Sequence, residues 1–218
     1  MSTYITAKVL EIGEDNRLIL EAEGDIFREY MHKGFGTVEL RMDDGRTISA
    51  EQRRKVFALI GDIAHWNGDE PDDLRKRLVW DFCREQDIPP FSLKTADMTT
   101  AREFISYLIE LCFRFDVPSM DVLLHRTDDV SRYLYLCLAY RKCCICGKKA
   151  DVHHCEGSKI GAGADRRKVH HKGREAIALC RRHQCQIEQK GDSWFFEAFH
   201  VYGTKLDEYL CRKLKLKV

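Results

Sequence analysis

The sequence predicts an α+β protein, in which a small N-terminal sheet with packed helices is followed by a metal-binding module. Three observations support this fold class. The first fifty residues contain stretches of alternating apolar and polar side chains, which are typical of strands. Apolar side chains then recur at helical spacing as far as Phe115. After Tyr140 the composition changes, because this part holds seven of the ten cysteines and six of the nine histidines. We therefore expect two domains, residues 1–128 and 129–218.

The net charge of +1 hides an asymmetry between these parts. Residues 141–218 carry 18 Lys and Arg against 9 Asp and Glu, a net charge of +9, and the remainder carries −8. A basic part rich in cysteine and histidine favours a polyanion as partner. The apolar runs are too short to span a bilayer and the N-terminus lacks the order of a secretory signal, so we expect an intracellular protein with no membrane partner. Thiols stay reduced there, so the cysteines indicate metal rather than disulfides.

Strand signals come first along the chain. Residues 4–10 and 37–42 alternate in character, with Val38, Leu40 and Met42 on one face. Asp44-Gly45 lies between two short β-prone stretches and indicates a hairpin.

Four helices follow the strand signals. Ser49 and Gln52 fit a capping box, and Asn67-Gly68 ends the helix that it begins. Pro71 opens the second helix and Pro89-Pro90 stops it. Thr100 with Glu103 is expected to cap the third helix, which Pro118 closes, and the fourth runs roughly over residues 130–142. The expected inward positions are Val56, Leu59, Ile60, Ile63, Leu74, Leu78, Phe82, Phe104, Leu108, Leu111 and Phe115.

Two short-spaced pairs in the basic part predict a structural zinc site. The predicted Zn²⁺ ligands are Cys143, Cys146, Cys180 and His183, arranged as Cys-x2-Cys and Cys-x2-His. Gly147 would let the backbone turn beneath the metal. Cys144, Cys155 and Cys185 are left over, and Cys185 could replace His183 as the fourth ligand, although the spacing favours His183.

The first helix carries a resemblance to a known family. Residues 46–68, "RTISAEQRRKVFALIGDIAHWNG", resemble the phage Orf-type recombination mediators, and the likeness covers roughly residues 1–117. The matching positions are Arg46, Thr47, Gln52, Arg53, Lys55, Leu59, Gly61, Asp62, Trp66, Asn67 and Gly68. The resemblance implies a homodimer in the host cytoplasm that binds single-stranded or branched DNA. It further implies that the protein helps to load a recombinase on DNA coated by single-strand-binding protein.

A second resemblance covers roughly residues 130–205. The adjacent His153-His154 between the two zinc pairs, with a later "FHVYG", resembles a phage family of HNH (ββα-metal) nucleases. The resemblance implies that His153 ligates a divalent metal, Mg²⁺ or Mn²⁺. It implies that His154 is the general base that activates water for attack on phosphorus.

The sequence departs from this family at two helix positions. Gln184 and Glu188 stand where members of the family usually have histidine. Glu188 can still ligate a hard cation, whereas Gln184 is a poor ligand. The asparagine that gives HNH its middle letter has no clear counterpart, and Glu175 is nearest by spacing.

Basic residues suggest where DNA would bind. The predicted DNA-binding residues are Arg166, Arg167, Lys168, Lys172 and Arg174 in the loop 161–174, with Arg53 and Arg54 on the first helix. Such contacts to phosphate are independent of sequence, and the alternative is a solvated surface. Residues 193–199 have helical spacing and are expected to belong to the core rather than to form a base-stacking platform.

These observations favour a phage-type DNA recombination protein that binds single-stranded DNA and carries an HNH endonuclease module of weakened metal-dependent activity. The alternative is a non-catalytic recombination mediator that uses the HNH fold as a zinc-stabilised DNA-binding scaffold. A zinc-stabilised adaptor for protein interactions is a third class, against which the basic loop argues.

Overall fold

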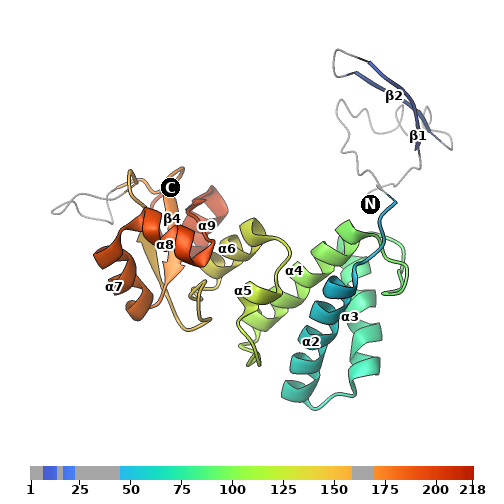
Figure 1. Ribbon diagram of the computed structural model, residues 1–218, viewed down its shortest axis with the longest axis horizontal. Coiled ribbons are helices and arrows are strands. Elements are labelled where there is room, and N and C mark those ends of the chain that lie inside the picture. Colours follow the sequence, from blue (N-terminus) through green and yellow to red (C-terminus); the bar gives the residue numbers. More distant parts are fainter. Residues whose placement is uncertain (1–6, 14–16, 23–44, 159–168) are drawn as a thin grey trace.

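The computed structural model describes residues 7–13, 17–22, 45–158 and 169–218 (Figure 1). The predicted strand at residues 37–42 and the basic residues Arg166, Arg167 and Lys168 lie outside these ranges. The described elements are, in chain order, β1 (Ala7–Ile12), β2 (Leu18–Ala22), α2 (Ala50–Asn67), α3 (Pro71–Gln86), α4 (Met98–Arg114), α5 (Leu123–Arg126), α6 (Val130–Ala139), β3 (Asp151–His154), β4 (Glu175–Leu179), α7 (Arg181–Lys190), α8 (Asp192–Phe199), β5 (Thr204–Lys205) and α9 (Glu208–Leu214).

An antiparallel hairpin of β1 and β2 stands at the N-terminal side of the helices. Its register shifts between Val9 and Glu11, which is the mark of a β-bulge. The strand predicted at residues 4–10 is confirmed over its described part. The second strand, β2, was not anticipated from the sequence.

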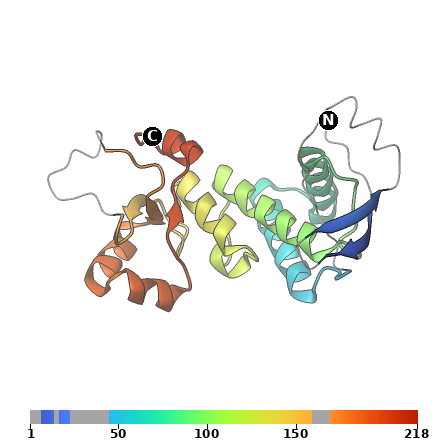
Figure 2. The same cartoon turned by 90° about the horizontal axis from the view of Figure 1, so that it is seen from above.

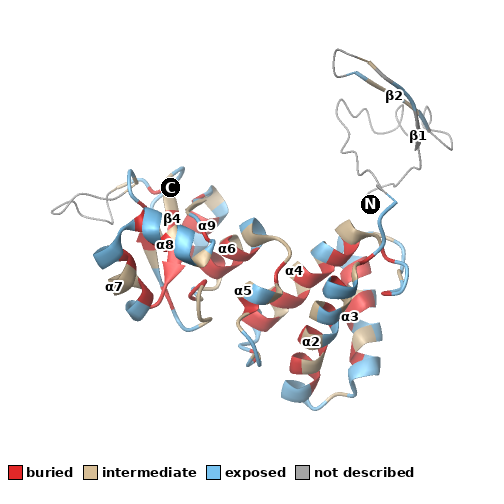
Figure 3. Ribbon diagram, viewed as in Figure 1, coloured by how far each residue is buried: buried red, intermediate tan, exposed pale blue. Residues whose placement is uncertain are grey.

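Helices α2, α3 and α4 form a helical half whose apolar faces turn inward (Figure 3). The predicted capping box is present, since Ser49 Oγ accepts the N–H of Gln52 and Gln52 Oε1 accepts the N–H of Ser49, both at 3.0 Å. Gly68 ends α2 with a φ of +78°, a left-handed conformation that favours glycine. Pro71 opens α3 as predicted.

The predicted cap of the third helix is wrong. Helix α4 begins at Met98, and its N-cap is Asp97, whose carboxylate accepts the N–H of Thr100 at 2.8 Å. Thr100 therefore lies inside the first turn. Phe115 also departs from its predicted inward position, because it follows the last helical residue and is 54% exposed.

Helix α6 joins the helical half to the second half, where it packs against α4, β4, β5 and α9 (Figures 1 and 2). Tyr133 on this helix is fully buried, and its hydroxyl donates to the carbonyl of Cys144 at 2.9 Å. An ion pair joins α5 to α2, with Arg126 Nη1 at 2.6 Å from Asp62 Oδ2 and only 11% and 8% of the two side chains exposed. Helix α6 thus fixes the start of the cysteine-rich segment onto the core.

The second half is built on a three-stranded antiparallel sheet in the order β3-β4-β5. His153 pairs with Ile177 and His154 with Ala176, so β4 lies directly beside the histidine pair. Helix α7 follows β4 after Cys180, and α8 follows α7. None of the helices in the described ranges is long and apolar enough to cross a membrane.

Candidate metal centre and active site

The four predicted zinc ligands lie together. The group comprises Cys143, Cys146, Cys180 and His183, and its ligand atoms all lie within 4.8 Å of one another. Tetrahedral zinc with Zn–S of about 2.3 Å and Zn–N of about 2.05 Å places sulfur atoms about 3.8 Å apart and sulfur about 3.6 Å from nitrogen. The Sγ atoms of Cys146 and Cys180 are 3.7 Å apart, and His183 Nδ1 is 3.2, 3.6 and 3.3 Å from Cys143, Cys146 and Cys180. The donor set therefore fits zinc.

Local backbone geometry brings the two pairs together. Gly147 has a φ of +69°, and its N–H donates to the carbonyl of Cys143 at 2.8 Å, so the chain turns back beneath the first pair. Cys180 is the N-cap of α7 and His183 lies in its first turn. All ten cysteines fall within the described ranges, and none of them forms a disulfide there. Cys185 lies outside the metal-binding group.

Burial and hydrogen bonding set the protonation of these ligands. Burial raises the pKa of the Cys143 thiol to about 12. Burial also acts to raise the pKa of Cys180, but hydrogen bonds led by the backbone N–H of His183 outweigh it, and that pKa lies below its usual value. The pKa of His183 is lowered by burial and by the nearby charges of Arg182 and Lys148, which keeps the imidazole neutral. A bound cation would favour the Cys143 thiolate too.

The side chains of His153 and His154 on β3 lie in different environments, because neighbouring side chains of a strand face opposite sides of the sheet. His154 Nε2 lies 3.0 Å from Nδ1 of His171, which is fully buried. The backbone N–H of His171 donates to the carbonyl of Lys217 at 2.9 Å. His171 reaches the site, whereas the ring of His170 contacts the Val218 carbonyl.

His153 faces an acidic residue that sequence reasoning missed. Its Nε2 lies 3.8 Å from Oδ1 of Asp192, and both side chains are buried. The other carboxylate oxygen of Asp192 accepts the N–H of Glu156 at 2.7 Å. A signal existed in the sequence, because Gln184, Glu188 and Asp192 recur at intervals of four. His153 and Asp192 thus place an imidazole and a carboxylate side by side.

The two helix positions that depart from the HNH pattern contact each other. Gln184 Nε2 donates to Glu188 Oε1 at 2.9 Å, and Glu188 is exposed. Among the described residues, no group of three or more close histidine, cysteine, aspartate or glutamate ligands includes Glu188 or His153. The structure therefore does not gather the predicted divalent-metal ligands into a multidentate site.

The described basic residues differ in how many hydrogen bonds and ion pairs their side chains form within the chain. Arg174 donates from Nε to the carbonyl of His170 at 2.8 Å and from Nη1 to that of Ser158 at 3.0 Å. Its guanidinium thus ties together the chain on either side of residues 159–168. Lys172 is exposed and lies 3.3 Å from Glu208.

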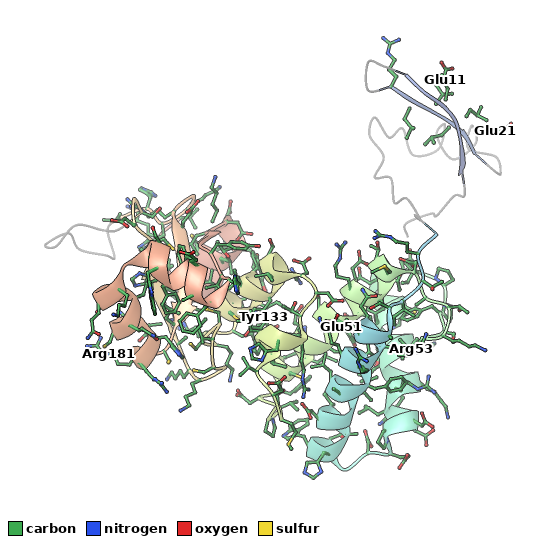
Figure 4. All side chains as sticks on the ribbon, in the orientation of Figure 1. Glu11, Glu21, Glu51, Arg53, Tyr133 and Arg181 are labelled. Atoms are coloured by element: carbon green, nitrogen blue, oxygen red, sulfur yellow. The ribbon has the colours of Figure 1, made fainter. Side chains whose placement is uncertain are left out.

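On α2, Arg54 is exposed. Arg53 is half-buried and donates to the carbonyl of Lys94 at 3.4 Å (Figure 4). Arg54 is therefore freer than Arg53 to contact a phosphate.

A Cys/His group that can hold a metal ion, next to a strand–strand–helix unit with adjacent histidines on its first strand, is typical of a nuclease-like metal-binding module. A family model described as "Putative HNHc nuclease" matches residues 23–217, and the chain belongs to this HNH nuclease family. The match runs through the helical half as well as the metal-binding half. No curated protein and no solved structure matches the chain.

Proposed function

We propose that the protein is an HNH-type endonuclease that hydrolyses phosphodiester bonds of single-stranded or branched DNA with the help of a divalent cation. The observation that carries this proposal is the position of His154 at the end of β3, held by the buried imidazole of His171. The family of the chain supports the reaction class. Zn²⁺ bound at the Cys/His group would hold the start of α7 against the loop after Cys143.

The hydrogen bond between the two imidazoles decides which nitrogen can act as a base. A neutral imidazole has one N–H and one lone pair. If His154 Nε2 accepted a proton from His171, its Nδ1 would carry the hydrogen and neither nitrogen could take a proton from water. The general base therefore requires that His154 Nε2–H donates to His171 Nδ1, so that the lone pair that takes the proton lies on His154 Nδ1. In this role His171 fixes the tautomer of His154.

His153 would hold the divalent cation, Mg²⁺ or Mn²⁺, together with Asp192 or Glu188. Such a cation supplies positive charge to the phosphate as negative charge develops there. Asp192 is the nearer carboxylate, and its hydrogen bond from Glu156 holds it in place. A histidine and a carboxylate are few protein ligands, so we expect weak metal affinity and slow cleavage.

We further propose that this nuclease acts in phage-type DNA recombination, as a homodimer in the host cytoplasm, with single-strand-binding protein and a recombinase as partners. The likeness of residues 46–68 to Orf-type mediators supports this role. Arg54, Lys172 and the basic residues 166–168 would contact the phosphates. Residues 129–218 would act as the zinc module.

A second candidate function is a mediator without catalytic activity. The observation that favours it is the hydrogen bond between Gln184 and Glu188, which occupies the positions of two family histidines. In this case the zinc module is a scaffold that binds DNA.

Cleavage of a circular single-stranded DNA separates the two candidates, because a circle has no end for an exonuclease. The zinc-loaded protein is incubated with the circle in Mg²⁺, in Mn²⁺ or without added divalent cation. The proposal predicts linear product only with a divalent cation. Stable DNA binding without linear product under any of these conditions would favour the mediator.

A further inference from the structure

A polar, aromatic cavity that neither His153 nor His154 lines lies where α4, α6 and α9 meet. It has a volume of about 260 Å³. Its charged and aromatic lining residues are Glu110, Arg132, Tyr135, Tyr140, Tyr209 and Lys213. We call this cavity the tyrosine groove. Buried Leu136 and Ala139 of α6 also line it.

The walls of the tyrosine groove are held in place by contacts between the three helices. Glu110 accepts hydrogen bonds from the hydroxyl of Tyr140 at 2.9 Å and from Arg132 at 3.1 Å. The hydroxyl of Tyr135 donates at 2.9 Å to Asp207, the N-cap of α9. These bonds fix the rings before any ligand arrives.

Aromatic faces and cations alternate around the groove. The rings of Tyr135 and Tyr209 are nearly parallel, with an angle of 12° between their planes, and Tyr209 is 56% exposed. Lys213 Nζ lies 4.0 Å from the ring centre of Tyr140 and 5.5 Å from that of Tyr209. The guanidinium of Arg132 lies 5.7 Å from the ring centre of Tyr135.

The charge of the groove favours an anion with a flat group attached. Glu110 is the one carboxylate among its lining residues, and Arg132 offsets its charge. Lys213 Nζ donates a hydrogen bond to the hydroxyl of Tyr209 at 3.2 Å, and within the described part of the chain no carboxylate pairs with it, so its positive charge is not neutralised before a ligand binds. Along the same C-terminal segment, Arg212, Lys215 and Lys217 add exposed positive charge.

We propose that the tyrosine groove binds a base of single-stranded DNA, with the base on the ring of Tyr209 and a neighbouring phosphate at Lys213. Stacking of bases on aromatic side chains, combined with cations along the backbone, is the usual way in which proteins hold single strands. Duplex DNA does not suit the groove, because its bases are already stacked on one another. The inference rests on the proposed function only in taking DNA as the ligand.

The test compares binding of a fluorescent dT12 strand with an abasic strand of the same length, without added divalent cation. Tyr209→Ala should weaken binding of dT12 about five- to tenfold and leave abasic binding within about twofold. Tyr209→Phe keeps the ring and loses only the hydroxyl that accepts a hydrogen bond from Lys213, so it should bind dT12 within about twofold of the wild type. Lys213→Ala should weaken both strands and make binding less dependent on salt, by about one unit of the log–log slope.

A matched control comes from α3. Trp80 is 55% exposed with the guanidinium of Arg84 at 4.7 Å from its ring centre, but it does not line the groove. Trp80→Ala should therefore leave binding unchanged. A U12 strand of the same length shows whether the groove also accepts RNA. If it does, Tyr209→Ala should weaken the binding of dT12 and of U12 equally.

Three outcomes would overturn the inference: no binding of dT12 by the wild type, equal loss of dT12 and abasic binding in Tyr209→Ala, or no loss at all. A lower melting temperature of Tyr209→Ala with unchanged binding would give Tyr209 a structural role only. Binding that depends on Tyr209 in a protein that cuts no DNA would support the groove while the nuclease proposal fails. DNA cleavage by the wild type, with no effect of Tyr209→Ala on dT12 binding, would refute the groove as a base-binding site and leave the nuclease proposal standing.

Discussion

Replacing Cys143 by serine should remove the structural zinc and destabilise the second half of the chain. Cys143 is fully buried, and its Sγ lies 3.2 Å from His183 Nδ1. Serine is a poor zinc ligand, because its hydroxyl does not ionise readily near neutral pH. The remaining three ligands would no longer enclose the metal.

The expected cost follows from the loop that the metal closes. Coordination by Cys143 and Cys180 joins residues 37 positions apart. A cross-link that closes a loop of this length restricts the unfolded chain by about 4 kcal/mol. Total stabilities are about 5–15 kcal/mol, so this loss removes much of the margin. If residues 129–218 unfold as one unit, as the proposed domain division requires, the melting temperature should fall by roughly 15 °C or more.

The assay measures zinc per chain by elemental analysis and melting by near-ultraviolet circular dichroism. Cys185→Ser is the matched control, because Cys185 lies on the same helix as His183 but outside the metal-binding group. The control should keep one zinc and the wild-type melting temperature. Wild-type protein without zinc, or a Cys143→Ser variant that melts like the wild type, would refute the reasoning.

Three further predictions concern the candidate active site and the core. Gln184→His combined with Glu188→His should restore the histidines typical of the family and raise the rate of cleavage with Mn²⁺ or Ni²⁺, which accept imidazole. A wild type that cuts as fast as this double variant would show that Glu188 is a sufficient metal ligand. His171→Phe should lower kcat about tenfold or more with little change in KM, whereas His171→Asn, whose amide oxygen can accept the His154 N–H, should retain more activity. Asp62→Ala should cost about 3–5 kcal/mol in urea unfolding, because it leaves the buried charge of Arg126 without its partner at 2.6 Å; a cost below about 1 kcal/mol would contradict this.

Local signals made the helices and the Cys/His metal-binding group predictable. A capping box needs only residues three positions apart, so Ser49 and Gln52 identify the start of α2 without tertiary information. The short spacings around Cys143 and Cys180 likewise limit which side chains can reach one metal. The cap of α4 was mistaken because Asp97 and Thr100 are both good cap residues. The sequence does not tell which of them has an extended backbone.

Contacts between distant segments could not be predicted in the same way. His171 meets His154 across 17 positions of sequence, and its backbone is held by a bond to Lys217 near the C-terminus. Asp192, in the first turn of α8, approaches His153 on β3 across 39 positions of sequence. The tyrosine groove forms only where three helices meet, and no local sequence pattern predicts such a meeting point.

Cleavage of circular single-stranded DNA by the His154→Ala variant tests the central claim most directly. The variant is compared with the wild type in saturating Mn²⁺, after both have been shown to contain equal zinc and to bind the DNA equally. Loss of a general base should lower the rate of linearisation about 100-fold or more. A variant that cuts within about twofold of the wild-type rate would contradict the assignment of His154 as the base of an HNH nuclease.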